Sequence, residues 1–282
     1  MKKSINAWTF PDAYTFEDCF AAAKTAGFDA IEFNVDKEGR SAHSLYLSTA
    51  DEELLGIKAL AEKYGIEIPS ISTSLTAGLW ALTDGESKKL ILAIVEAQLK
   101  AAKLLGADTI LTVPGGMKDG MLLSEARANS IKNIKEAIPL FEKWGVKVGL
   151  ENVWNAFFLS PYDMLSFIDE IDHPLVGAYF DLGNMVAFSD TVHWADLLAE
   201  RTFKIHIKDY KRVGGVNRGG AFVQLLEGDV DFKRAMQILK AKGFDGYLTA
   251  EVFKDDPNMS DADYLRSIVD AEQIIAGYYD EA

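Results

Sequence analysis

Short apolar runs alternate with longer segments of helical periodicity along the whole chain. Short apolar runs bounded by turn residues indicate buried strands, whereas apolar positions recurring every three or four residues indicate amphipathic helices. Strands are predicted at residues 4–8, 30–35, 66–72, 108–113, 146–151, 176–181, 203–207 and 246–252. Helices are predicted at about residues 15–26, 50–64, 86–105, 124–144, 161–171, 192–200, 231–242 and 261–278.

Glycine separates five of the predicted helices from the strand that follows, and these positions are Gly27, Gly65, Gly106, Gly145 and Gly243. Glycine is typical here because the residue after a helix often adopts a left-handed backbone conformation. Helices that alternate strictly with strands make the strands parallel, since each crossover returns the chain to the same edge of the sheet.

Two architectures have this order of elements, a closed (β/α)8 barrel and an open doubly wound sheet. The 282 residues give roughly 35 residues for each strand and helix pair, which suits a barrel. No G-x-G-x-x-G motif follows the first predicted strand and no P-loop motif occurs, which weakens the open sheet. We therefore predict an α/β fold, a (β/α)8 TIM barrel, with residues 1–282 forming a single domain.

Polar residues end the last four predicted strands, and in a TIM barrel the strand ends carry the chemistry. These residues are Glu151, Asp181, His206 and Glu251. Each alone has an ordinary explanation, such as a helix cap, a loop residue or a core histidine. Together, three carboxylates and one imidazole suit a divalent cation, with Mn²⁺ preferred and Mg²⁺, Co²⁺ or Zn²⁺ as alternatives. Without a cation, the clustered carboxylates would raise one another's pKa.

Composition and charge argue against nucleic-acid-binding, disulfide-bonded and membrane-spanning proteins. The chain has 29 Lys and Arg against 43 Asp and Glu, a formal net charge of −14 that argues against nucleic-acid binding. Cys19 is the only cysteine, so no intrachain disulfide forms, and a reducing compartment fits. Lys2 and Lys3 are not followed by the apolar core of a signal peptide, and no apolar run approaches the ~20 residues of a membrane span. We expect a soluble cytoplasmic protein.

Four segments around these residues carry a family resemblance: residues 150–152 (LEN), 180–184 (FDLGN), 206–212 (HIKDYKR) and 227–232 (EGDVDF). With Glu251 they make the chain resemble the xylose-isomerase-like TIM barrel superfamily. Within it, the chain looks most like the sugar phosphate isomerase/epimerase branch and its ketose 3-epimerases. The resemblance is strongest over residues 145–255, and its motifs are specific for the superfamily but weak for the substrate.

The resemblance implies a small sugar or sugar phosphate as substrate, and assembly as a homodimer or homotetramer. It also implies that Arg212 faces the oxygens of the substrate, and that the metal ligands are Glu151, Asp181, His206 and Glu251. Asn184 stands where tagatose-type epimerases usually have a histidine that contacts substrate. Those enzymes carry a second glutamate six residues after the ligand on the fifth strand, where this chain has Phe157, which puts a free-ketose epimerase with standard sugar contacts in doubt.

The expected reaction is epimerisation at C3 through an enediolate that the metal stabilises as a Lewis acid. We expect Glu151 and Glu251 to be ligands and also the acid–base pair that removes a proton from one face and returns it to the other. Lys208 has the same strand parity as His206 and is a candidate for substrate binding or a solvated lysine. Trp8 and Glu32 end the first two strands and either line the pocket or belong to the rim or plug of the barrel.

Three other functions remain as alternatives. Metal-dependent lyases of the same family, such as inosose dehydratase-like or 3-keto-glycoside-cleaving enzymes, begin with the same proton removal but lose water or an aglycone. A DNA repair enzyme like endonuclease IV requires more histidines and a basic groove, which the single rim histidine and the charge of −14 oppose. A non-catalytic sugar-binding barrel would bind no metal.

Overall fold

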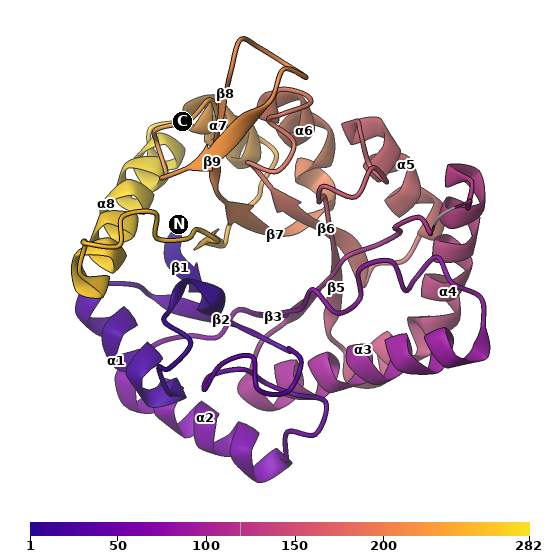
Figure 1. Ribbon diagram of the computed structural model, residues 1–282, viewed down its shortest axis with the longest axis horizontal. Coiled ribbons are helices and arrows are strands. Elements are labelled where there is room, and N and C mark those ends of the chain that lie inside the picture. Colours follow the sequence, from indigo (N-terminus) through magenta and orange to yellow (C-terminus); the bar gives the residue numbers. More distant parts are fainter. Residues whose placement is uncertain (119) are drawn as a thin grey trace.

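A closed barrel of eight parallel strands forms the centre of the computed structural model, which describes residues 1–118 and 120–282 (Figure 1). The strands follow one another around the barrel in the order β1-β10-β7-β6-β5-β4-β3-β2, and the helices lie outside them. The predicted (β/α)8 TIM barrel is therefore confirmed.

The element bounds are close to those predicted. The barrel strands are β1 (Lys2–Asn6), β2 (Ala30–Asn34), β3 (Ser70–Ser72), β4 (Thr109–Thr112), β5 (Lys147–Glu151), β6 (Val176–Asp181), β7 (Thr202–Ile207) and β10 (Tyr247–Ala250). The α-helices are α1 (Phe16–Ala26), α2 (Asp51–Tyr64), α3 (Gly85–Leu105), α4 (Leu123–Trp144), α5 (Pro161–Ile171), α6 (Thr191–Leu198), α7 (Phe232–Ala241) and α8 (Asp261–Asp280). Two short 3-10 helices are η1 (Ala7–Thr9) and η2 (Ala199–Arg201). None of the helices in the described residues is long and apolar enough to cross a membrane.

The glycines end the helices as predicted. Helices α1 to α4 each stop at a glycine in the left-handed conformation, at Gly27, Gly65, Gly106 and Gly145. Helix α7 differs slightly, because Lys242 is its C-cap and Gly243 takes the positive φ one residue later.

Two differences from the predicted elements bear on the site. The first strand ends at Asn6 rather than at Trp8, because the Asn6 side chain accepts a hydrogen bond from the Trp8 backbone N–H and starts η1. An unpredicted antiparallel hairpin also follows β7, formed by β8 (Asp209–Arg212) and β9 (Gly220–Val223).

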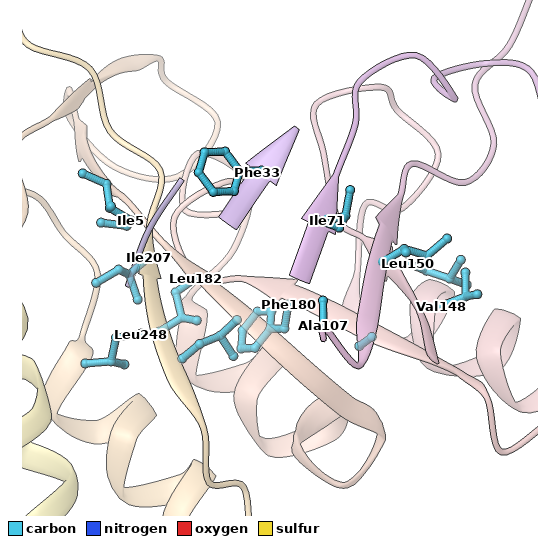
Figure 2. Close-up of a cluster of buried hydrophobic side chains, with 14 of the residues drawn as sticks. Ile5, Phe33, Ile71, Ala107, Val148, Leu150, Phe180, Leu182, Ile207 and Leu248 are labelled. Carbon is cyan, nitrogen blue, oxygen red and sulfur yellow. The ribbon is translucent and has the colours of Figure 1, made fainter. Parts of the chain in front are cut away.

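The alternation of side chains along each strand separates the apolar core from a polar lumen. Figure 2 shows buried apolar residues of the strands, among them Val148, Leu150 and Phe180. The residue that follows Leu150 is Glu151, and the residue that follows Phe180 is Asp181. Apolar side chains on one face of each strand therefore pack in the core. The alternate side chains point to the other face, where the polar residues of the site lie.

Candidate metal centre

Four neighbouring strands of the barrel bring together the four predicted ligands. Glu151 and Asp181 are the last residues of β5 and β6, His206 lies in β7, and Glu251 directly follows β10. The register pairs Asp181 with His206, and the Glu251 backbone N–H donates to the carbonyl of Ile207 on the neighbouring strand. One ligand atom from each of the four side chains lies within 4.8 Å of all the others.

The imidazole of His206 uses its two nitrogens on different partners. Its Nδ1 lies 3.2 Å from Glu151 Oε1 and 3.0 Å from Glu251 Oε2, so Nδ1 faces the carboxylate cluster. Its Nε2 lies 2.6 Å from Oε1 of Glu32, a fully buried residue of β2. Burial alone would lower the pKa of His206, but the charge of Glu32 and the hydrogen bonds to the carboxylates raise it well above its usual value.

Asp181 is held from one side only. Its Oδ1 accepts backbone hydrogen bonds from Gly183 at 2.8 Å and Asn184 at 2.6 Å. Its Oδ2 is buried and has no hydrogen bond within the described residues, and the ammonium of Lys208 lies 3.2 Å away. Glycine is required at position 183, because a Cβ there would lie 2.5 Å from the Lys208 carbonyl oxygen. Asp181 therefore presents Oδ2 to the cluster, where it faces the Lys208 ammonium but accepts no hydrogen bond within the described residues.

Lys208 places a positive charge beside the carboxylates. Its Nζ lies 2.9 Å from Glu251 Oε2 as well as 3.2 Å from Asp181 Oδ2. Burial alone would lower the pKa of Lys208, but the charges of Asp181, Glu251 and Glu151 raise it. Burial opposes ionisation of Glu251 as well, yet Lys208 and His206 hold its pKa well below the usual range.

The remaining two carboxyl groups respond as expected for crowded acids. Burial, together with the charge of Glu251, raises the pKa of Glu151 to about 7. Burial also raises the pKa of Asp181, and again Glu251 adds to the effect. Three carboxylates and one imidazole fit the donor set of a divalent cation, and the buried Oδ2 of Asp181 accepts no hydrogen bond within the described residues.

A cavity of about 660 Å³ opens beside this cluster. Glu151, His206 and Glu251 contribute to its wall, and so do the aromatic side chains of Trp8, Trp154, Phe222 and Phe253. Cavities of this size bind small molecules in many enzymes. The arrangement places acids, a base and a cation-binding donor set against a space that a small substrate can enter.

The predicted substrate-binding residues separate into two groups. Trp8, Asn184 and Lys208 line the cavity. Arg212, which belongs to β8, is not among the lining residues. Its guanidinium donates to the carbonyls of Val186 and Ser189 at 2.6 and 2.9 Å and pairs with Asp190 at 2.8 Å. The structure thus directs Arg212 to the segment before α6 and does not bring it to the cavity.

Phe157 is buried away from the cavity. Its ring packs with Phe158 and Phe167 at centroid distances of 4.8 and 5.5 Å. Gly115 lies directly over that ring, where a Cβ would overlap it. The position at which tagatose-type epimerases carry a glutamate is therefore part of the apolar core in this chain.

Sequence reasoning missed the aromatic residues Trp154, Phe222 and Phe253 of the cavity wall. The rings of Trp154 and Phe222 lie 5.2 Å apart between centroids, and the Trp154 indole N–H donates to the carbonyl of Asn184. Trp154 follows the predicted ligand Glu151 by three residues, and this short spacing could have placed it near the site. Phe222 belongs to β9 of the unpredicted hairpin.

Comparison with known proteins places this geometry among related barrels. A family model described as xylose isomerase-like TIM barrel matches residues 20–270. The L-ribulose-5-phosphate 3-epimerase UlaE of Salmonella typhi is 24% identical over 236 residues, covering 83% of this chain and 80% of that protein. The protein MJ1311 of Methanocaldococcus jannaschii is 23% identical over 170 residues, covering 58% of this chain and 57% of that protein.

Two solved structures share the fold over nearly the full chain. The IolI protein with a bound zinc atom superposes with a TM-score of 0.81 at 16% identity, covering 99% of both chains. The D-psicose 3-epimerase of Clostridium cellulolyticum H10, solved with D-tagatose, superposes with a TM-score of 0.79 at 17% identity, also covering 99% of both. At these identities the likeness shows the fold.

Proposed function

This chain belongs to the xylose isomerase-like TIM barrel family, and from that premise we propose that it is a divalent-metal-dependent enzyme that epimerises a ketose or ketose phosphate at C3. The observation that carries the proposal is the set of four donors from neighbouring strands, all within 4.8 Å of one another beside a cavity of about 660 Å³. The 3-epimerase names of one relative and one structural neighbour support the choice of reaction.

The ligands in this proposal are Glu151, Asp181, His206 through Nδ1, and Glu251. We prefer Mn²⁺ for this donor set, with Mg²⁺, Co²⁺ and Zn²⁺ as alternatives. A cation bound here would supply Lewis-acid polarisation of the substrate carbonyl and so acidify the neighbouring C–H bond.

We assign proton transfer to Glu151 and Glu251. Both carboxylates approach His206 Nδ1, at 3.2 and 3.0 Å, but they come from β5 and from the end of β10, with β6 and β7 between those strands in the barrel. Two acids on opposite sides of a substrate carbon can invert it, because one removes the proton and the other returns a proton to the opposite face. The product then has the same mass as the substrate.

The substrate is held by the residues of the cavity wall in this proposal. The ammonium of Lys208 and the side chain of Asn184 are polar groups beside the cluster, and Trp8 offers an apolar face. The indole N–H of Trp8 donates to Asp36 at 3.1 Å, which fixes the orientation of that ring. Arg212 has an indirect role here, since its guanidinium holds residues 186–190 next to Asn184.

Incubation of the Mn²⁺-loaded protein with a panel of ketoses and ketose phosphates in D₂O tests the function. Deuterium at C3 in a product with an unchanged carbon skeleton supports epimerisation. Deuterium accompanied by loss of water or an aglycone identifies the lyase alternative instead. Absence of exchange with every member of the panel, in protein that binds no cation, would overturn the proposal and favour a sugar-binding barrel.

Glu151→Gln tests the assigned acid–base pair. The amide can still reach the cation but cannot carry the proton, so we expect the exchange rate to fall by about 10²–10⁴-fold while metal is retained. Glu142→Gln, on the exposed face of α4, is the matched control and should leave the rate unchanged. A Glu151→Gln protein with bound metal and full activity contradicts the assignment.

A cytoplasmic location and assembly as a homodimer or homotetramer also belong to this proposal. Light scattering on the purified protein measures the oligomeric state.

A further inference from the structure

We propose that Glu32 is a positioning residue that holds His206 with a proton on Nε2, so that the lone pair of Nδ1 points at the cation. The inference rests on the proposed metal site and extends it to β2, a strand that contributes none of the four ligands. Glu32 Oε1 lies 2.6 Å from His206 Nε2, and both side chains are almost completely buried.

Three further donors surround the same carboxylate. Asn6 Nδ2 donates to Glu32 Oε1 at 2.6 Å, and Ser70 Oγ donates to Oε2 at 2.6 Å. The Tyr179 hydroxyl also donates to Oε2. These donors come from β1, β3 and β6, so side chains from both halves of the barrel hold Glu32 in place.

The assignment of the Asn6 amide follows from its other contact. The Asn6 side-chain oxygen accepts from the Trp8 backbone N–H at 2.9 Å, so the amide nitrogen must face Glu32. Glu32 is therefore an acceptor toward its neighbours, and a carboxylate acceptor requires a donor at His206 Nε2. A neutral imidazole that donates from Nε2 has its lone pair on Nδ1, the atom facing Glu151 and Glu251.

The ring of His206 has little freedom to turn away from this arrangement. The Tyr179 ring packs against it with centroids 4.5 Å apart, and the same Tyr179 donates to Glu32. Carboxylates that accept from the free nitrogen of a ligating histidine fix its tautomer and raise its basicity, and losing them typically costs about 10–100-fold in metal affinity. A carboxylate that only filled the lumen would affect stability without changing cation binding.

Calorimetric titration of the metal-free protein with Mn²⁺ and Zn²⁺ separates these two roles. We expect Glu32→Gln to weaken the Kd about 10–100-fold. Glu272→Gln is the matched control, because Glu272 is an equally buried glutamate that contacts the Ser4 backbone and none of the ligands. It should leave the Kd unchanged. Circular dichroism confirms that each variant is folded.

The tautomer itself is read from long-range ¹H–¹⁵N spectra of the Zn²⁺-loaded protein, which has only four histidines. The expected spectrum of the wild type shows His206 protonated on Nε2 and bound through Nδ1. A proton on Nδ1 in this spectrum would refute the assignment even when Glu32→Gln does not fold.

The outcomes keep the two proposals apart. Wild-type protein that binds neither cation refutes the metal site itself. If the wild type binds a cation, two results refute the role of Glu32 and leave the proposed function standing. One is a folded Glu32→Gln variant with the same Kd as the wild type, and the other is His206 protonated on Nδ1.

Discussion

Replacing Lys208 by methionine removes the buried ammonium that faces the carboxylate cluster. In the metal-free protein this ammonium lies 2.9 Å from Glu251 Oε2 and 3.2 Å from Asp181 Oδ2. At an effective dielectric constant of about 20, each contact is worth about 5 kcal/mol of Coulomb attraction before desolvation is subtracted. Removing one partner of such a buried pair typically costs about 3–5 kcal/mol, because the other charge is left uncompensated.

We therefore expect Lys208→Met to lower the free energy of unfolding by about 3–5 kcal/mol in the presence of EDTA. For a chain of this size that corresponds to a fall in Tm of roughly 6–20 °C. A divalent cation neutralises the same carboxylates, so the loss should shrink when metal saturates the site. The variant should also bind the cation at least about tenfold more tightly, a difference of about 1.4 kcal/mol, since no ammonium competes for the oxygens.

Urea unfolding with EDTA or with saturating Zn²⁺ measures the stability, and calorimetry measures the affinity. The matched control is Lys204→Met, also on β7, where the buried ammonium lies 2.8 Å from Asp108 Oδ1. Its stability loss should be the same with and without metal. Equal stability of Lys208→Met and wild type in EDTA, or weaker cation binding by the variant, would refute the electrostatic reasoning.

Two further predictions concern the scaffold. Gly115→Ala should destabilise the protein by about 1–3 kcal/mol or more in urea unfolding, because Gly115 has a φ of +68° and a Cβ would overlap the ring of Phe157. Gly39→Ala, at a φ of +78° with no neighbour within 4 Å of the added Cβ, should cost only about 1 kcal/mol, and equal losses would contradict the packing argument. Burial raises the pKa of Glu272 well above its usual value, so the folded state keeps a proton that the unfolded chain releases. The stability from this group is complete below the unfolded pKa and declines as the pH rises toward the folded pKa. Glu272→Gln should remove that decline, so the variant gains stability relative to wild type as the pH rises above the unfolded pKa, and parallel pH profiles in urea unfolding would show the prediction to be wrong.

Periodicity predicted the alternating strands and helices, because these and their glycine ends are local features of a sequence. The chain length and the missing nucleotide-binding motifs then favoured the closed barrel over the open sheet. The four donors followed from one additional rule, that parallel strands of a barrel end on one face. Glu151, Asp181, His206 and Glu251 could be placed together without knowing any side-chain contact, and the structure does bring them within 4.8 Å.

Features that depend on distant contacts could not be predicted in the same way. The direction of Arg212 depends on the carbonyls of Val186 and Ser189 and the carboxylate of Asp190, which only the folded hairpin brings near. The sequence offered Glu32 as a residue of the pocket, the rim or the plug of the barrel, but could not identify its partner His206, which lies 174 positions away. The β8–β9 hairpin was not predicted because the sequences of its strands show no alternating apolar pattern.

The barrel closes where the first strand, β1, pairs with the last barrel strand, β10, and this seam affects how the chain folds during synthesis. Lys2 pairs with Tyr247, so β1 leaves the ribosome long before the strand that must lie beside it. At about 5–20 residues per second, the nascent chain carries an unpaired β1 edge for tens of seconds. Glu251 follows that late strand, which means that the full donor set exists only after the seam can close. On the proposed function, a cation would therefore meet its complete donor set only late in folding.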